Sequence, residues 1–82
     1  MMKIRNLVRD DQLVSCVISG SSGRRGAFAV LLELGSLRPE TEIPPECRRM
    51  LRRALPAIRQ ALLENRIPSV SEGRCLSLSI PS

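Results

Sequence analysis

A chain of 82 residues, 43% of them hydrophobic, suffices for one small domain over residues 1–82, and such a domain buries only about 60% of its unfolded surface. Phe28 is the only aromatic residue, so we expect an aliphatic core. The absence of histidine excludes Ser-His and Cys-His nucleophile pairs and any imidazole ligand for zinc. We therefore expect a protein that is not an enzyme, with no catalytic residues, no metal site and no cofactor.

Two segments of alternating hydrophobicity predict a β-hairpin. Residues 12–19 place Val14, Cys16 and Ile18 on one face, and residues 27–34 do the same for Phe28 and the apolar residues that follow it. The glycine-rich residues 20–26 connect the two segments, which is typical of a hairpin with a long turn. Residues 3–8 are a candidate for a further strand with a weaker pattern.

Residues 47–65 carry the only strong helical periodicity. Pro44 and Pro45 suit the first helical positions. Pro56 removes the hydrogen bond to the carbonyl of Arg52 and should kink the helix, with a division into two short helices as the alternative. At 100° per residue, one arc of this helix holds its apolar side chains: Cys47, Met50, Leu51, Ala54, Leu55, Ile58, Ala61 and Leu62.

Residues 75–80 alternate again and predict a last strand after the helix. The element order is then (β)ββαβ, with the first strand in doubt. This order predicts an α+β fold in which a small, mostly antiparallel sheet carries the kinked amphipathic helix on one face.

Arginine supplies twelve of the thirteen basic residues, and the net charge is +5. The helix side opposite the apolar arc carries Arg48, Arg49, Arg52, Arg53 and Arg59. Guanidinium groups pair with carboxylates and phosphates, so these side chains are candidates for binding nucleic acid or an acidic protein partner. Two alternatives need no partner: an ordinary solvated helix face, and a GC-rich gene that encodes arginine in place of lysine.

Arg24 and Arg25 lie between two glycines in the predicted hairpin turn, in the string Gly23-Arg-Arg-Gly26. Glycines let a backbone approach a phosphate closely, and the arginines would add charged hydrogen bonds. The alternative is a hairpin tip that the two arginines keep soluble. The turn lacks the lysine ending of a nucleotide-binding phosphate loop.

The second face of the predicted hairpin is also rich in apolar residues. Leu13, Val17, Ala29 and Leu31 point away from the face that the helix is expected to cover. Exposed apolar patches of this kind mark interaction surfaces more often than bare surface. We expect these four residues to form the interface of a homo-oligomer.

These features favour a non-enzymatic protein-interaction module: a small oligomeric regulatory or accessory factor, for which a viral or phage origin is one setting. The alternative is a basic nucleic-acid-binding protein that grips phosphates through the arginine-rich helix and the Gly-Arg-Arg-Gly turn. The lack of aromatic side chains for base stacking and the modest net charge favour a protein partner.

Three cysteines without close spacing suggest a reducing, intracellular and cytoplasmic setting. Neither a signal peptide nor a membrane-spanning segment is expected, and a membrane is not an expected partner.

Overall fold

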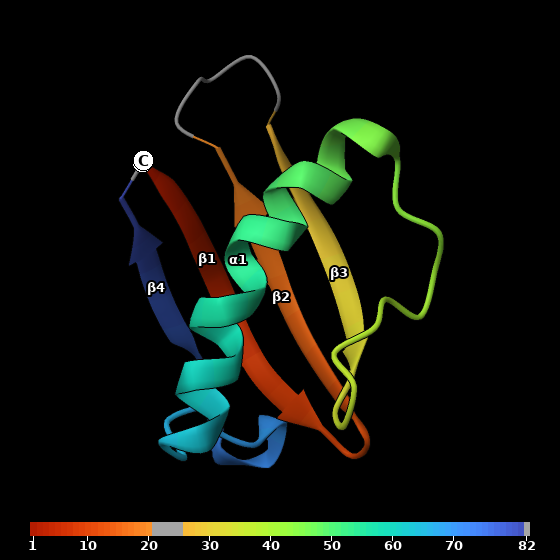
Figure 1. The fold of residues 1–82 in the computed structure, drawn as a ribbon. Coiled ribbons are helices and arrows are strands. Elements are labelled where there is room, and N and C mark those ends of the chain that lie inside the picture. Colours follow the sequence, from red (N-terminus) through yellow and green to blue (C-terminus); the bar gives the residue numbers. More distant parts are fainter. Residues whose placement is uncertain (21–25, 82) are drawn as a thin grey trace.

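The computed structural model describes residues 1–20 and 26–81. Its elements are β1 (Met2–Asp10), β2 (Leu13–Ser19), β3 (Ala27–Glu33), α1 (Pro45–Leu63), a short 3₁₀ turn η1 (Val70–Glu72) and β4 (Leu76–Ile80). The strands form one antiparallel sheet in the order β3-β2-β1-β4, and α1 crosses one face of it (Figure 1). The predicted α+β fold is confirmed.

The uncertain first strand is real, and β1 lies inside the sheet between β2 and β4. Its pattern is weak because the strand changes phase once. Met2 and Ile4 point into the core before the change, and Leu7 does so after it. Asn6, with φ 56°, occupies the change, and the pairing of β1 with both neighbouring strands shifts there. One extra residue in a strand is a β-bulge, and it reverses the faces of all residues beyond it.

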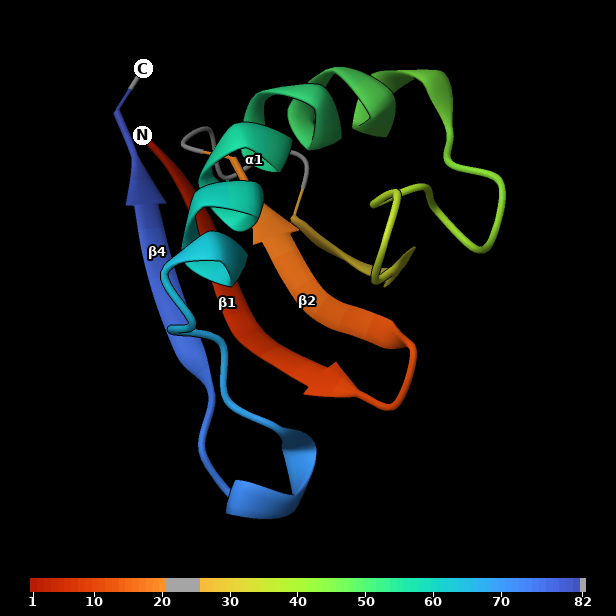
Figure 2. The same ribbon diagram turned by 60° about the horizontal axis from the view of Figure 1, so that its bottom comes forward.

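Helix α1 begins at Pro45, with Pro44 as the preceding cap, and runs without interruption through Pro56 to Leu63. The alternative of two short helices is therefore wrong. The helix bends between its two halves, as the two views show (Figures 1 and 2). Because Pro56 lacks the N–H for the helical hydrogen bond and its ring crowds the preceding turn, it is the physical cause of a bend here.

The core lies between α1 and the sheet face beneath it. From the helix, Leu51, Ala54, Ile58 and Ala61 are buried, all of them within the predicted apolar arc. From the sheet, the largest fully buried side chains are aliphatic, with one cysteine among them: Ile4, Leu7, Val14, Cys16, Ile18 and Leu32. No polar or charged residue is buried in the part of the chain that the structure describes.

Connecting segments complete this thin core. Leu37 and Ile43 from the segment before α1, and Ile67 from the segment after it, are each no more than 6% exposed. The segment before α1 also pairs with the outer edge of β3, where the Glu40 N–H donates to the Leu31 carbonyl at 2.9 Å and the Glu33 N–H donates to the Arg38 carbonyl at 2.8 Å. The β3 edge is thus partly covered by the chain itself.

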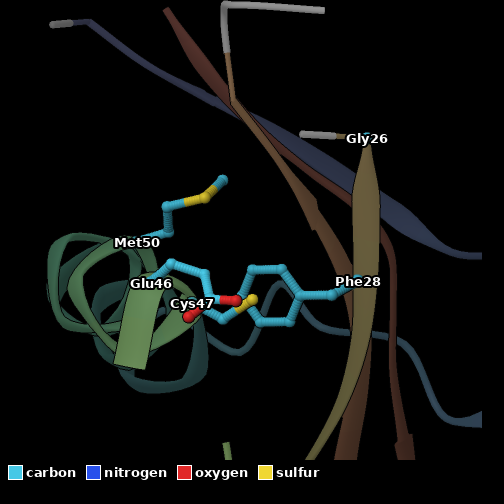
Figure 3. Close-up of a pocket in the computed structure, with 5 residues that line it drawn as sticks. All are labelled: Gly26, Phe28, Glu46, Cys47 and Met50. Carbon is cyan, nitrogen blue, oxygen red and sulfur yellow. The ribbon is translucent and has the colours of Figure 1, made fainter. Parts of the chain in front are cut away.

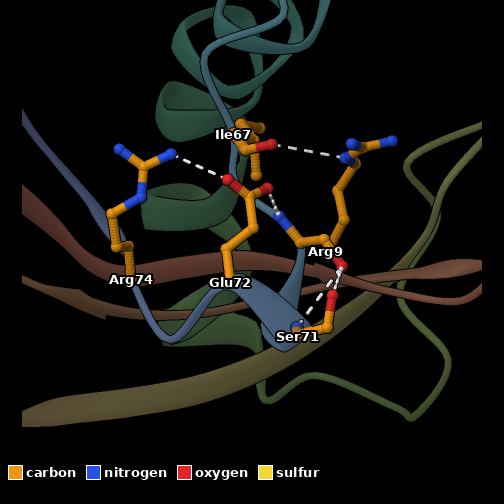
Figure 4. Close-up of polar contacts among 6 residues, drawn as sticks. Arg9, Ile67, Ser71, Glu72 and Arg74 are labelled. Carbon is orange, nitrogen blue, oxygen red and sulfur yellow. Dashed lines mark hydrogen bonds and ion pairs between the residues drawn. The ribbon is translucent and has the colours of Figure 1, made fainter.

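The segment after α1 is held to the end of β1. The Arg9 N–H donates to the Pro68 carbonyl at 2.8 Å, and Nε of Arg9 donates to the Ile67 carbonyl at 3.3 Å (Figure 4). The next turn is closed by a capping box, in which the Ser69 N–H donates to Oε2 of Glu72 at 2.8 Å. These bonds direct the chain into β4, which pairs with β1 at the sheet edge.

Candidate functional site

The sheet face opposite α1 is covered by no described element, and we call it the open sheet face (Figures 1 and 2). Its side chains follow from the strand registers, because residues directly opposite in antiparallel strands point to the same face. They are Lys3, Arg5, Val8, Asp10, Leu13, Ser15, Val17, Ser19, Ala27, Ala29, Leu31, Glu33, Ser77 and Ser79.

All four residues of the predicted oligomer interface lie together on this face. Val17 lies directly opposite Ala29, and Leu31 lies opposite Ser15. Leu13 and Val17, on the inner strand β2, are half-buried, whereas Ala29 is exposed and Leu31 is 41% exposed on the edge strand. The structure therefore places the four side chains on one continuous surface that no described helix or strand covers.

Val8 belongs to the same surface, and sequence reasoning missed it. It lies opposite Ser15, in the row that continues to Leu31. Simple alternation from Ile4 would turn Val8 into the core, but the bulge at Asn6 reverses the phase. Asn6 was the only indication of the bulge in the sequence, because asparagine tolerates a positive φ better than most residues.

Charged residues lie at the two ends of the open sheet face and have opposite signs. Lys3 and Arg5 lie on β1 toward one end. Asp10 lies on β1 toward the other end, where Leu13 stands between it and Glu33. The uncharged row of Val8, Ser15 and Leu31 lies between the two ends, so charge on this face is separated along the strand direction.

The second candidate surface is the solvent side of α1. Arg48, Arg49, Arg52, Arg53 and Arg59 are all exposed there, as the periodicity predicts. Arg48 donates through Nε to the Ile43 carbonyl at 3.0 Å and lies 3.9 Å from Oε1 of Glu42. Within residues 1–20 and 26–81, the other four arginines have no carboxylate within salt-bridge distance. Arg24 and Arg25 fall outside the described residues.

A pocket opens between the start of α1 and the start of β3 (Figure 3). Phe28 extends from β3 toward the first turn of α1, and Glu46, Cys47 and Met50 complete the lining with Gly26. A second hollow lies at the other end of the helix, lined by leucines that include the 77% exposed Leu63, with Arg59 among them. Each hollow contains one charged side chain and otherwise mainly apolar atoms.

Three titratable side chains, Cys16, Glu64 and Glu72, have shifted pKa values. Burial raises the pKa of the Cys16 thiol to about 11. A hydrogen bond from Arg74 and a second from the Ser69 backbone lower the pKa of Glu72, and hydrogen bonds from Gln60 and Arg66 lower that of Glu64. Both glutamates are exposed, and their partners belong to helix and turn ends.

The described residues contain no cluster of three or more side chains that could hold a metal ion. Across the same ranges, no helix combines the length and the apolar character that crossing a membrane requires.

Comparison with known proteins gives no relative: no family model matches the sequence, and no curated protein or solved structure shows significant similarity.

Proposed function

We propose that the protein is a non-enzymatic protein-interaction module that assembles with itself through the open sheet face. The observation that carries the proposal is the apolar centre of that face: Val8, Leu13, Val17, Ala29 and Leu31. An antiparallel sheet whose second face meets water usually alternates apolar and polar residues cleanly. Here the solvent side of β2 and β3 is largely apolar, which favours a protein surface as its natural neighbour.

The thin core supports the same proposal. A domain of this size has little apolar surface to bury within itself, and three of its buried residues, Leu37, Ile43 and Ile67, come from connecting segments. Small domains often gain stability by oligomerisation. A second copy on the open sheet face would make a four-layer arrangement, with the two sheets inside and the two helices outside.

The test is the mass of the assembly in solution. Sedimentation or light scattering at micromolar concentration should give a multiple of the 9.1 kDa chain. Val17→Asp should shift the population toward monomer, because a charge at the centre of an apolar interface loses its hydration. Ser77→Asp is the matched control on the edge strand β4 and should shift it less. A wild-type protein that stays monomeric would overturn the proposal.

The exposed helix arginines favour a second candidate function, the binding of a polyanion such as nucleic acid. Arg49, Arg52 and Arg53 form a compact group with no carboxylate partner in the described chain. Like charges four residues apart, as in Arg49 and Arg53, destabilise a helix by a few tenths of a kcal/mol, and bound phosphates would offset that cost. In an assembly through the sheet, both helices would remain accessible.

A further inference from the structure

The separated charges of the open sheet face define how two copies would pack. We infer that the partner is a second copy of this chain, placed face to face by a two-fold axis that runs across the strands, so that Arg5 of each copy lies against Asp10 of the other. This inference rests on the proposed function and adds to it the partner's orientation and register.

The strand registers place the two charges symmetrically. Arg5 lies opposite Val17, and Asp10 lies opposite Leu13. On β2, Val17 and Leu13 are each two residues from Ser15, at about 7 Å on either side from the rise per residue. The row that contains Ser15 is therefore the midline between the basic row and the acidic row.

A face-to-face pair has two principal choices of two-fold axis in the plane between the sheets. An axis along the strands would keep the strand direction and put Arg5 of one copy on the basic end of the other. An axis across the strands reverses the direction and puts Arg5 on the acidic end. Like charges brought together at an interface repel each other, whereas opposite charges attract and fix the register, so the second axis is selected.

An axis through the Ser15 row also matches the apolar residues. Val17 of one copy then faces Leu13 of the other, and Leu31 faces its own equivalent. Two sheets packed in this way keep their strand directions within about 30° of each other and interdigitate their side chains. The arrangement is self-complementary, as a two-fold interface requires.

A charge-swap series tests the inference. Arg5→Asp alone and Asp10→Arg alone each create like-charged pairs, and each should raise the dissociation constant of the dimer roughly tenfold or more. The double variant Arg5→Asp/Asp10→Arg exchanges the charges in both copies and should restore a value near that of the wild type. Arg66→Asp, an exposed position after α1, controls for the change in net charge. Circular dichroism verifies that each variant is folded.

The outcomes separate the inference from the proposed function. Restoration in the double variant supports the crossed two-fold axis. If Val17→Asp disrupts the dimer but the double variant is no better than the single ones, the open sheet face is the interface and the register inferred here is wrong. If Val17→Asp has no effect on an oligomer that Ser77→Pro or Ser79→Pro disrupts, copies pair through the β4 edge and both proposals are overturned.

Discussion

The thiol of Cys75 donates to the side-chain oxygen of Asn6 at 3.8 Å, across 69 residues of sequence. Asn6 adopts a positive φ of 56° at the bulge of β1, and Cys75 directly precedes β4. The two residues thus meet where the pairing of β1 with β4 changes register, between Ile4 and Leu7. This bulge decides which side of β1 each later residue faces.

Substitution of Asn6 should therefore show the energetic cost of the bulge. Asn6→Val places a β-branched residue at a positive φ and should lower the free energy of unfolding by about 1–3 kcal/mol. Asn6→Gly relieves the backbone and loses only an exposed, weak hydrogen bond, so it should be nearly neutral. Urea denaturation of both variants measures the difference. Equal stability of the two variants would contradict a conformational requirement at Asn6.

Prediction from sequence reached the fold because alternation and helical periodicity are local properties. Residues 12–19 and 27–34, as well as the helix arc around Ile58, needed only their own pattern to be placed. The bulge in β1 could not be predicted from the pattern of that strand alone, because its position depends on pairing with β2 and β4. The burial of Leu37 and Ile43 could not be predicted either, because a connecting segment has no period that reveals which of its residues enters the core.

The residues of the candidate site divide in the same way, into those that one element's own pattern places and those that depend on strand pairing. Leu13 and Val17 could be assigned to the uncovered face from one strand alone. That Arg5 and Asp10 stand symmetrically about Ser15 depends on the register between β1 and β2, which sequence patterns do not supply. Val8 joined the surface for the same reason. The helix arginines were predictable as exposed, because their exposure follows from the period of α1 itself.

Stability in alkaline solution should depend on Cys16. Its pKa is raised from 9.0 to about 11 by burial, so the folded chain keeps this proton at pH values where the unfolded chain has lost it. The stabilisation is complete below about pH 9 and is lost as the pH rises toward 11, at roughly 1.4 kcal/mol per pH unit. The chain contains no tyrosine and one lysine, and Cys47 and Cys75 are its two other thiols.

Urea unfolding between pH 8 and pH 11 measures this loss. Cys16→Ala should be less stable at pH 8, because a small cavity remains in the core, but its stability should decline less steeply with pH. Cys75→Ala, at an exposed position, should keep the wild-type decline. An identical alkaline decline in the Cys16 variant would rule out the buried thiol as its cause.

Arg74 should control the titration of Glu72. Its Nη2 donates to Oε1 of Glu72 at 2.7 Å, and this bond is the main cause of the lowered pKa of that carboxyl (Figure 4). Arg74→Ala should raise the pKa toward its usual value, while the pKa of Glu64, which depends on Gln60 and Arg66, should not move. Carbon NMR of the side-chain carboxyls follows both residues in one titration.

The bond between Arg74 and Glu72 should also affect how the stability of the protein changes at acidic pH. Because the pKa of Glu72 is lower in the folded chain, its contribution to stability is present above the unfolded pKa of about 4.5. That contribution should disappear as the pH falls through the folded pKa. Arg74→Ala should therefore lose less stability on acidification than the wild type. A steeper acid response in the variant would contradict Arg74 as the main cause of the lowered pKa of Glu72.

The helix arginines can be tested by salt dependence, which distinguishes the two candidate partners. If Arg49, Arg52 and Arg53 follow a duplex DNA backbone, each phosphate contact adds about 0.9 to the slope of log affinity against log salt. Arg52→Gln should then lower the slope by about one contact and weaken binding to all sequences alike. Fluorescence anisotropy with two unrelated duplexes at several salt concentrations measures both effects, and Arg38→Gln, on the segment before α1, is the control.

An acidic protein partner would respond differently to the same substitutions. One or two arginines should then dominate the affinity, with the others nearly neutral, and salt should act mainly on the association rate.

A third result would exclude both nucleic acid and an acidic protein as partners of the helix arginines. If exchange of Arg48, Arg49, Arg52 and Arg53 for glutamine leaves binding and its salt dependence unchanged, this side of α1 is a solvated surface. The quadruple variant should then gain slightly in stability, because like-charged pairs four residues apart have been removed, and the open sheet face would be the only working surface among the described residues.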